Sequence, residues 1–242
     1  MNKISGFSKL SKNDKIKWII SNHFDGNSNE KNLLKKYWNN DKKIQRIHDD
    51  FSENTISNYY MPMGIAPNFN INDQYVILCP TNSHVDNENH RGYRSWPKRK
   101  WNDLIKIILR ETNLNIFLAG SLNEKEYFKE FYPLDKRVYD VSGLTTIPEL
   151  ISIMKNACYV VATDSGSAHV AGAVCKNIVC IHGPTNHHQS APCQTYKNNV
   201  KVATLNLNCS PCYDTDVIKK CQRNICMQSL SADLVFKLIN EF

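Results

Sequence analysis

Short apolar runs alternate with segments of helical spacing from residue 75 to the C-terminus. The apolar runs are rich in β-branched and aliphatic residues and have the length of buried strands. They cover residues 75–79, 115–119, 137–141, 159–162 and 178–181. The helical segments between them cover residues 101–111, a stretch that begins at Glu124, residues 147–156 and a small-residue stretch that ends at Ala173. This alternation predicts an α/β fold, a Rossmann-like parallel sheet with helices on its faces.

Two of the predicted helices have additional support. Thr146 and Glu149 have the spacing of a capping box and Pro148 falls in the first turn, so a helix is expected over residues 147–156. A last helix is expected over residues 232–242. Its apolar face, suited to docking, consists of Leu234, Val235, Leu238 and Ile239.

Residues 1–74 differ in character from the rest, since they are rich in Lys, Asn and Asp and carry few strand signals. Apolar residues at helical spacing predict three helices, through Ile16 to Ile20, Leu33 to Trp38 and Ile44 to Phe51. Two prolines and a glycine at residues 61–67 then interrupt helix formation. We therefore expect a helical N-terminal segment at 1–74 and a Rossmann-like domain at 75–242.

The polar turn after the run at 159–162 is the best candidate for chemistry. Unpaired backbone N–H groups at the N-terminus of the helix that follows favour an anion such as a phosphate, and Gly166 lets the backbone approach it closely. Asp164 can accept from a hydroxyl, and His169 lies about one helical turn further on. An alternative stays open, in which Asp164 caps the helix and His169 is a satisfied core residue.

A second polar loop supports the functional interpretation. Residues 182–185, His-Gly-Pro-Thr, follow the next predicted strand. Both loops would then lie at the carboxyl ends of adjacent parallel strands, where open α/β sheets bind their ligands.

Composition is that of a soluble globular protein. The chain has 242 residues, 41% of them hydrophobic, and a mean hydropathy of -0.47. No apolar run approaches the ~20 residues of a membrane span, and the N-terminus lacks the apolar core of a signal peptide, so a cytoplasmic protein is expected. The net charge of +7 favours anionic partners. Because the basic residues are spread along the chain, a nucleic-acid partner is not expected.

The cysteines fall into two groups. Cys79, Cys158, Cys175 and Cys180 lie in or beside predicted buried elements and are expected to be inert core thiols. The later group, Cys209-x2-Cys212-x8-Cys221-x4-Cys226, is expected by default to be reduced packed thiols, with a structural zinc, which these spacings could hold, as the alternative. A metal site at His187, His188 and Cys193 is disfavoured, because neighbouring side chains on an extended loop point apart.

Several motifs in order resemble one family. The strings RSWPKRKW, VSGLTTIPELISIMKNA, DSGSAHVAGA and HGPT look like the donor-binding domain of glycosyltransferase family 9, the bacterial lipopolysaccharide heptosyltransferases. The resemblance implies a GT-B-like enzyme that binds a nucleotide-sugar, typically ADP-heptose, and transfers the sugar with inversion to a lipopolysaccharide core or other glycan, with no required cofactor. It also implies a cytoplasmic protein with peripheral contact to the inner membrane.

The same resemblance implies the residues that bind the nucleotide-sugar. It identifies no catalytic residue in this chain. Arg94 also fits a solvated basic helix start with Lys98, Arg99 and Lys100, and Glu124 also fits a residue that favours the N-terminus of its helix. The implied residues are Thr81, Ser83, Arg94, Gly120, Ser121, Asp164, Ser165, Gly166, His169, Gly183, Pro184 and Thr185.

The N-terminal segment has a different resemblance. The strings GFSKLSKNDKIKWI and DDFSENTISNYYMPMGIAPNFNIND look like the N-terminal segment of class II hydroxymethylglutaryl-coenzyme A reductase, without its catalytic residues. This predicts a chimera with a seam near residues 72–76, no reductase activity and no acceptor domain. The N-terminal helices would then be loosely ordered or form a homodimer.

Three functions follow as hypotheses. The first is a glycosyltransferase, whose transfer would be slow without an acceptor domain to supply proximity and a general base. The second is a nucleotide-binding remnant without catalysis. The third is a zinc-stabilised interaction module.

Overall fold

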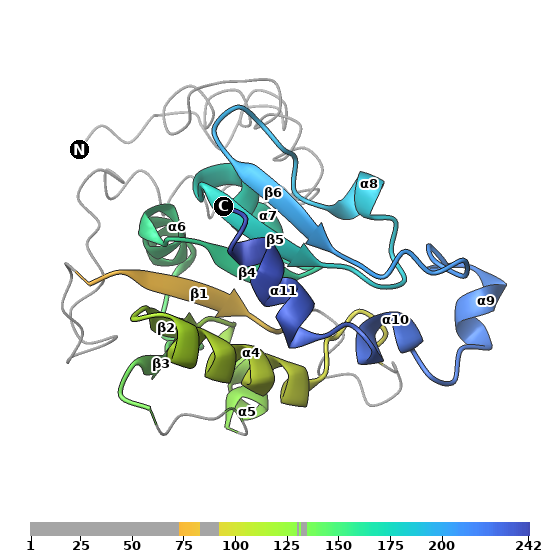
Figure 1. Cartoon of the computed structure of the whole chain (residues 1–242), viewed down its shortest axis with the longest axis horizontal. Helices are drawn as coiled ribbons and strands as arrows, with labels where there is room; N and C mark the ends of the chain where they lie inside the picture. The colour runs from red at the N-terminus through yellow and green to blue at the C-terminus, as the bar shows by residue number, and fades with distance from the viewer. Residues whose placement is uncertain (1–72, 83–91, 130, 132–134) are drawn as a thin grey trace, which may run out of the picture.

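A computed structural model of the chain describes residues 73–82, 92–129, 131 and 135–242. These residues form one parallel sheet of six strands in the order β3-β2-β1-β4-β5-β6, with helices on both faces (Figure 1). The predicted α/β, Rossmann-like fold is therefore confirmed. The strands are β1 (Tyr75–Cys79), β2 (Asn115–Leu118), β3 (Val138–Asp140), β4 (Val160–Thr163), β5 (Asn177–Ile181) and β6 (Asn199–Ala203).

The helices connect successive strands and close the chain. The longest are α4 (Lys98–Glu111), α6 (Ile147–Asn156), α7 (Gly166–Val174) and α11 (Ala232–Ile239). The shorter ones are the 3-10 turn η3 (Leu122–Glu124), α5 (Lys125–Phe128), α8 (His187–Ser190), α9 (Asp216–Lys219) and α10 (Ile225–Gln228).

The strand order places a topological switch point between β1 and β4. β1 pairs with β2 on one side and with β4 on the other, so Ile77 lies opposite Phe117 and Val160. The connection from β1 runs through α4 to β2, whereas the connection from β4 runs through α7 to β5, in the opposite direction along the sheet. Such a point opens a crevice at the carboxyl ends of the two strands.

Two hydrophobic layers hold the helices to the sheet. Because side chains alternate along a strand, Val76 and Leu78 of β1 pack toward α4 and α11, and Ile77 and Cys79 pack toward α6 and α7. Figure 1 shows α4 and α11 side by side on one face of the sheet. Trp96 joins this layer, since its indole N–H donates to the carbonyl oxygen of Leu230 over 3.1 Å. The C-terminal segment is thereby attached to the start of α4.

Helix ends follow the sequence closely where a cap is present. The backbone N–H of Thr146 donates to Glu149 Oε2 over 2.6 Å, which confirms the predicted capping box and the bounds of α6. The predicted docking face of the last helix is also confirmed: Val235 and Ile239 are buried, and Leu234 and Leu238 pack partly buried against the same layer.

Four elements were not predicted, and one is shorter than predicted. β6, α8, α9 and α10 lie where no element was expected. The helix expected from Glu124 is the η3 turn followed by the single turn of α5.

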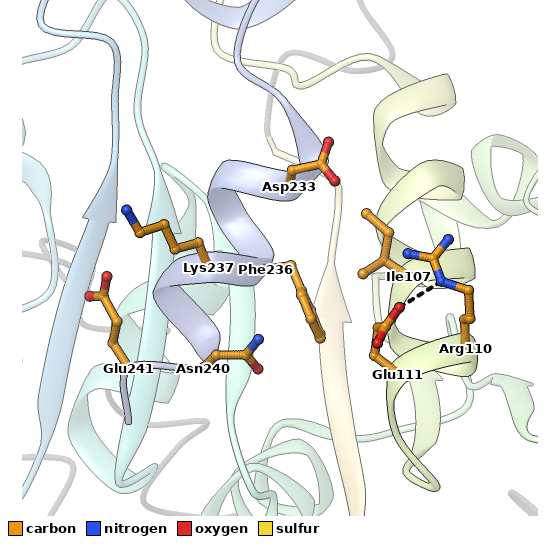
Figure 2. Close-up of a pocket in the computed structure, with 8 residues that line it drawn as sticks. All are labelled: Ile107, Arg110, Glu111, Asp233, Phe236, Lys237, Asn240 and Glu241. Atoms are coloured by element: carbon orange, nitrogen blue, oxygen red, sulfur yellow. Dashed lines mark hydrogen bonds and ion pairs between the residues drawn. The ribbon is translucent and has the colours of Figure 1, made fainter.

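A shallow groove separates α4 from α11 (Figure 2). Ile107 and Phe236 form its floor, and its rim carries charged side chains, with Arg110 Nε paired to Glu111 Oε1 over 2.6 Å. The groove lies beside the C-terminal end of α4, next to the amino end of β2, and so at the opposite end of the sheet from the crevice.

Some predictions fall outside the described residues. These are the three N-terminal helices, their proposed dimerisation, and Ser83. Among the described helices, none combines the length and the apolar character that a membrane crossing requires.

Candidate functional site

The loops that follow β1 and β4 meet at the switch point. The hydroxyl of Thr163, the last residue of β4, donates to the carbonyl oxygen of Thr81 over 3.1 Å. The backbone N–H of Asp164 donates to the carbonyl oxygen of Ile181 over 3.2 Å, which holds the β4 loop against the end of β5. Thr81 and Asp164 are both buried. These hydrogen bonds therefore join the carboxyl ends of β1, β4 and β5 at the switch point.

Arg94 reaches this crevice and lies beside Asp164. Its Nη1 is 3.6 Å from Asp164 Oδ2, and the two side chains are 18% and 6% exposed. The guanidinium also lies over the ring of Tyr213, 5.3 Å from the ring centroid. Arg94 therefore does not belong to a solvated helix start, because it compensates a buried carboxylate that would otherwise be costly.

The N-terminus of α7 is open. Ser165 is the N-cap residue, yet no side chain caps the helix, so the alternative in which Asp164 acts as the cap is wrong. Gly166 is exposed, and a Cβ built on it would meet no atom within 4 Å. The start of α7 thus has no side-chain cap and has free space beside Gly166, and an uncapped helix N-terminus of this kind is suited to anions.

Two buried oxygens at this N-terminus lack hydrogen bonds within the described part of the chain. They are Asp164 Oδ2 and Ser165 Oγ. Buried polar atoms are nearly always hydrogen-bonded, so a ligand hydroxyl that donates to Asp164 Oδ2 and a phosphate oxygen that accepts from Ser165 Oγ would satisfy them. His169 lies one turn along α7 and is buried; its role as a ligand residue stays a prediction beside the core interpretation.

The loop after β5 forms another wall of the crevice. His182 is fully buried, with Nδ1 3.2 Å from Thr185 Oγ1 and Nε2 3.2 Å from Cys180 Sγ. Burial lowers the pKa of His182 to about 4, against the opposing effect of the Asp164 charge, so the ring is neutral at pH 7. The carbonyl oxygen of Pro184 accepts from the backbone N–H groups of Cys212 and Tyr213 over 2.8 and 2.9 Å.

Gly183 and Gly120 have local packing roles. A Cβ at Gly183 would lie 2.7 Å from Met227 Cγ, so the glycine permits α10 to pack on this loop. A Cβ at Gly120 would lie 2.7 Å from Phe128 Cζ. The backbone N–H of Ser121 donates to Glu124 Oε2 over 2.6 Å, so Glu124 caps its own turn. The predicted contacts of Gly120 and Ser121 with a nucleotide stay a prediction.

The four later cysteines share one pocket but do not form a metal centre in this structure. Cys209, Cys212, Cys221 and Cys226 line a pocket of about 500 Å³ next to Pro184. Burial, and then the neighbouring thiols, raise the pKa of Cys226 to about 11. No three His, Cys, Asp or Glu side chains among the residues that the structure describes are arranged to hold a metal ion. The zinc site stays a prediction.

The other thiols and the histidine pair are also placed by the structure. Burial raises the pKa of Cys79 to about 12 and that of Cys175 to about 11, as expected for inert core thiols. His187 and His188 lie in α8 with ring centroids 4.1 Å apart. The expectation of an extended loop with diverging rings was therefore wrong.

Sequence reasoning missed three residues of the crevice. His182 stood within the motif at 182–185 but was not chosen, because a ring buried under a loop has no separate signal. Tyr213 lies in the cysteine segment, and only the fold brings it under Arg94. Asn82, which is buried and donates from its amide to Ser95 Oγ over 3.1 Å, links the β1 loop to the segment that carries Arg94.

Comparisons with known proteins identify the family and the fold. The sequence model of glycosyltransferase family 9 (heptosyltransferase) matches residues 28–222. Lipopolysaccharide heptosyltransferase 1 of Campylobacter coli is 23% identical over 247 aligned positions, covering 90% of this chain and 68% of the relative. Lipooligosaccharide heptosyltransferase 2 of Haemophilus influenzae is 25% identical over 104 positions, covering 41% of this chain and 30% of the relative.

Solved structures show the same fold. The family 9 glycosyl transferase of Veillonella parvula has a TM-score of 0.56 at 14% identity, over 88% of this chain and 59% of its own. The E. coli heptosyltransferase WaaC with ADP has a TM-score of 0.50 at 16% identity, over 82% of this chain and 56% of its own. This chain thus spans little more than half the length of the solved structures.

These matches correct the expectation of a chimera. The family match begins at residue 28 and runs through the seam expected at 72–76, so it does not support a foreign, reductase-like N-terminal block. The expectation rests on the resemblance of two strings within residues 4–75 to that reductase. Because the match covers most of the chain, we conclude that this chain belongs to glycosyltransferase family 9, the heptosyltransferase family.

Proposed function

We propose that the crevice at the switch point binds the diphosphate of a nucleotide-sugar and that the chain acts in heptosyl transfer. The observation that carries the proposal is the Arg94–Asp164 pair beside the open N-terminus of α7. The pair supplies a cation and a hydroxyl acceptor, and the helix supplies unpaired N–H groups. A nucleotide-sugar offers phosphates and hydroxyls within a short span, which matches this combination.

The same groups would assist the chemical step. When the sugar leaves, negative charge grows on the diphosphate, and preorganised N–H groups and a cation stabilise that charge without further rearrangement. Arg94 is held by Asp164 and by the Tyr213 ring before any ligand arrives. The crevice is therefore suited to the leaving group, and the acceptor hydroxyl would be activated elsewhere.

ADP-heptose is the proposed sugar donor, and a lipopolysaccharide core sugar the proposed acceptor. Two solved structures of E. coli WaaC are described with ADP and with ADP-2-deoxy-2-fluoro heptose. The curated relatives are named as lipopolysaccharide and lipooligosaccharide heptosyltransferases. These names support the proposal through family membership, and the crevice supports it through its chemistry.

One of the arguments for slow sugar transfer, a foreign N-terminal block in place of an acceptor domain, is not supported, because the family match begins at residue 28. An assay with ADP-heptose and a core acceptor tests the rate of transfer directly. Turnover would support a transferase, and ADP binding without turnover would support the non-catalytic alternative.

Binding is tested by calorimetric titration with ADP and ADP-heptose, compared with UDP and GDP. We expect the adenine nucleotides to bind more tightly. The variant R94M removes the cation and leaves Asp164 uncompensated, so ADP affinity should fall at least about tenfold. The matched control is R110M, because Arg110 is 68% exposed and lies in the groove at the opposite end of the sheet. Equal affinity of wild type and R94M would refute the site.

A further inference from the structure

We propose that His182 is a positioning residue that holds the Thr185 hydroxyl as a hydrogen-bond donor toward the diphosphate. This inference rests on the proposed function, because it assigns a ligand to a hydroxyl in the same crevice. His182 directly follows β5, and its backbone N–H donates to the carbonyl oxygen of Ala203 over 2.9 Å. The ring is thus anchored to the sheet and not to a loose loop.

His182 and Cys180 project to the same face of the sheet. They are two residues apart along an extended backbone, and Cys180 packs in the layer under α6 and α7. The sulfur of Cys180 lies 3.2 Å from His182 Nε2. Both side chains are 0% exposed, so the two polar groups must satisfy each other or find other protein partners.

The partners decide which ring nitrogen carries the proton. Burial raises the pKa of Cys180 well above its usual value, so the sulfur keeps its hydrogen. A thiol can donate a weak hydrogen bond through its S–H, and its sulfur is a poor hydrogen-bond acceptor. Within the described part of the chain, the other acceptor near this S–H is the carbonyl oxygen of Thr163 at 3.9 Å, so the nearer imidazole nitrogen is the better partner. Nε2 therefore accepts, and in a neutral ring Nδ1 must carry the hydrogen.

This assignment fixes the role of Thr185. Nδ1–H donates to Thr185 Oγ1 over 3.2 Å, which occupies a lone pair of the hydroxyl oxygen and leaves the hydroxyl hydrogen for another acceptor. No other hydrogen bond of that hydroxyl is recorded within the described residues. A diphosphate presents only acceptor oxygens, so it requires donors. With the opposite tautomer, Thr185 would donate to the ring and present only lone pairs, which would repel a phosphate.

The loop that carries Thr185 belongs to the wall of the crevice. The carbonyl oxygen of Pro184 accepts from Cys212 and Tyr213, and the Tyr213 ring lies beneath the Arg94 guanidinium. Arg94 in turn pairs with Asp164, whose backbone N–H is bonded to Ile181. These contacts and the chain from Ile181 to Pro184 form a closed circuit, and Thr185 directly follows Pro184 on it.

The test uses a matched pair of variants of the full chain. In H182N the side-chain amide can take the place of Nδ1 and donate to Thr185, whereas in H182Q the amide reaches toward the position of Nε2. We expect H182Q and T185V each to weaken ADP binding about tenfold by calorimetry, and H182N to stay within about threefold of wild type. The double variant H182Q/T185V should be no weaker than either single variant, because both remove the same hydrogen bond.

A structural role alone would give a different pattern. H182N as weak as H182Q, or effects of H182Q and T185V that multiply in the double variant, would overturn the inference. The tautomer is read separately from imidazole ¹⁵N spectra of the ligand-free protein, where Nδ1 should be the protonated nitrogen; a protonated Nε2 would overturn the inference even if H182Q fails to fold. Absence of ADP binding by wild type would overturn the proposed function itself, and the spectra would still report the tautomer.

Discussion

The open space at Gly166 leads to a prediction in which stability and binding change in opposite directions. The substitution is G166A in the first turn of α7. The backbone of Gly166 lies outside the left-handed region, and the new Cβ would meet no protein atom within 4 Å. The fold therefore does not require glycine at this position. If glycine is required at all, it is required by a ligand that approaches the backbone.

The magnitudes follow from these contacts. Replacing a glycine whose conformation alanine can adopt stabilises a protein by about 0.4–1 kcal/mol, because the unfolded chain loses freedom. For a protein of this size that corresponds to a rise in Tm of roughly 1–4 °C. A methyl group that keeps a phosphate from the helix N–H groups would remove a hydrogen bond to a charged group, worth about 1.5–3 kcal/mol, or a ten- to hundredfold loss of affinity.

The assay combines thermal unfolding without ligand and calorimetric titration with ADP. The control is G172A in the same helix, where a Cβ would lie 2.6 Å from Pro192 Cβ. G172A should lower the Tm and leave the ADP affinity of the folded protein unchanged, which is the reverse pattern. An unchanged ADP affinity of G166A, together with a raised Tm, would refute the placement of the diphosphate at this helix.

Two further predictions concern stability and metal content. The pKa of His182 is about 4 in the folded protein and 6.5 in the unfolded chain. Between these two pH values the unfolded chain binds a proton that the folded protein does not, so acid favours unfolding. The free energy of unfolding should therefore be highest above pH 6.5 and should fall by about 2 kcal/mol by pH 5. Urea unfolding at pH 7 and pH 5 measures this fall, H182N should reduce it, and equal midpoints would contradict it. The spacing of Cys209, Cys212, Cys221 and Cys226 could hold one zinc per chain, but packed reduced thiols are the default expectation and the structure does not arrange three of these thiols around one ion. We therefore expect less than about a tenth of an equivalent of zinc by metal analysis of protein purified without added zinc, with C209S/C212S as the control; close to one equivalent of zinc that is lost in C209S/C212S would refute this.

The sequence predicted the buried strands and the capped helix well. The strands β1, β4 and β5 are apolar on both faces, so their composition differs from every neighbouring segment. The bounds of α6 were correct because a capping box is a local signal. The parallel, Rossmann-like character of the sheet then followed from the alternation of strands and helices.

Edge elements and loop contacts could not be predicted in this way. β6 pairs only with β5 and is half-exposed, with Lys201 in its centre, so its apolar pattern is too weak to distinguish from a loop. Arg94 could not be assigned to Asp164, because 70 residues of chain separate them and only the pairing of β1 with β4 brings their loops together. The resemblance of two strings within residues 1–74 to a reductase was misleading, since the family match runs from residue 28 across the expected seam.

The ion pair in the crevice has a consequence for selectivity. An empty crevice is nearly neutral, because Arg94 already has a counter-ion in Asp164. A phosphate that engages Arg94 leaves that carboxylate in need of a new partner, and a sugar or ribose hydroxyl is a suitable one. Inorganic diphosphate has no sugar or ribose hydroxyl, so it would separate Arg94 from Asp164 and leave the Asp164 carboxylate without a hydrogen-bond donor. The ion pair would thus favour binding of a diphosphate that is linked to a sugar or ribose over binding of inorganic diphosphate.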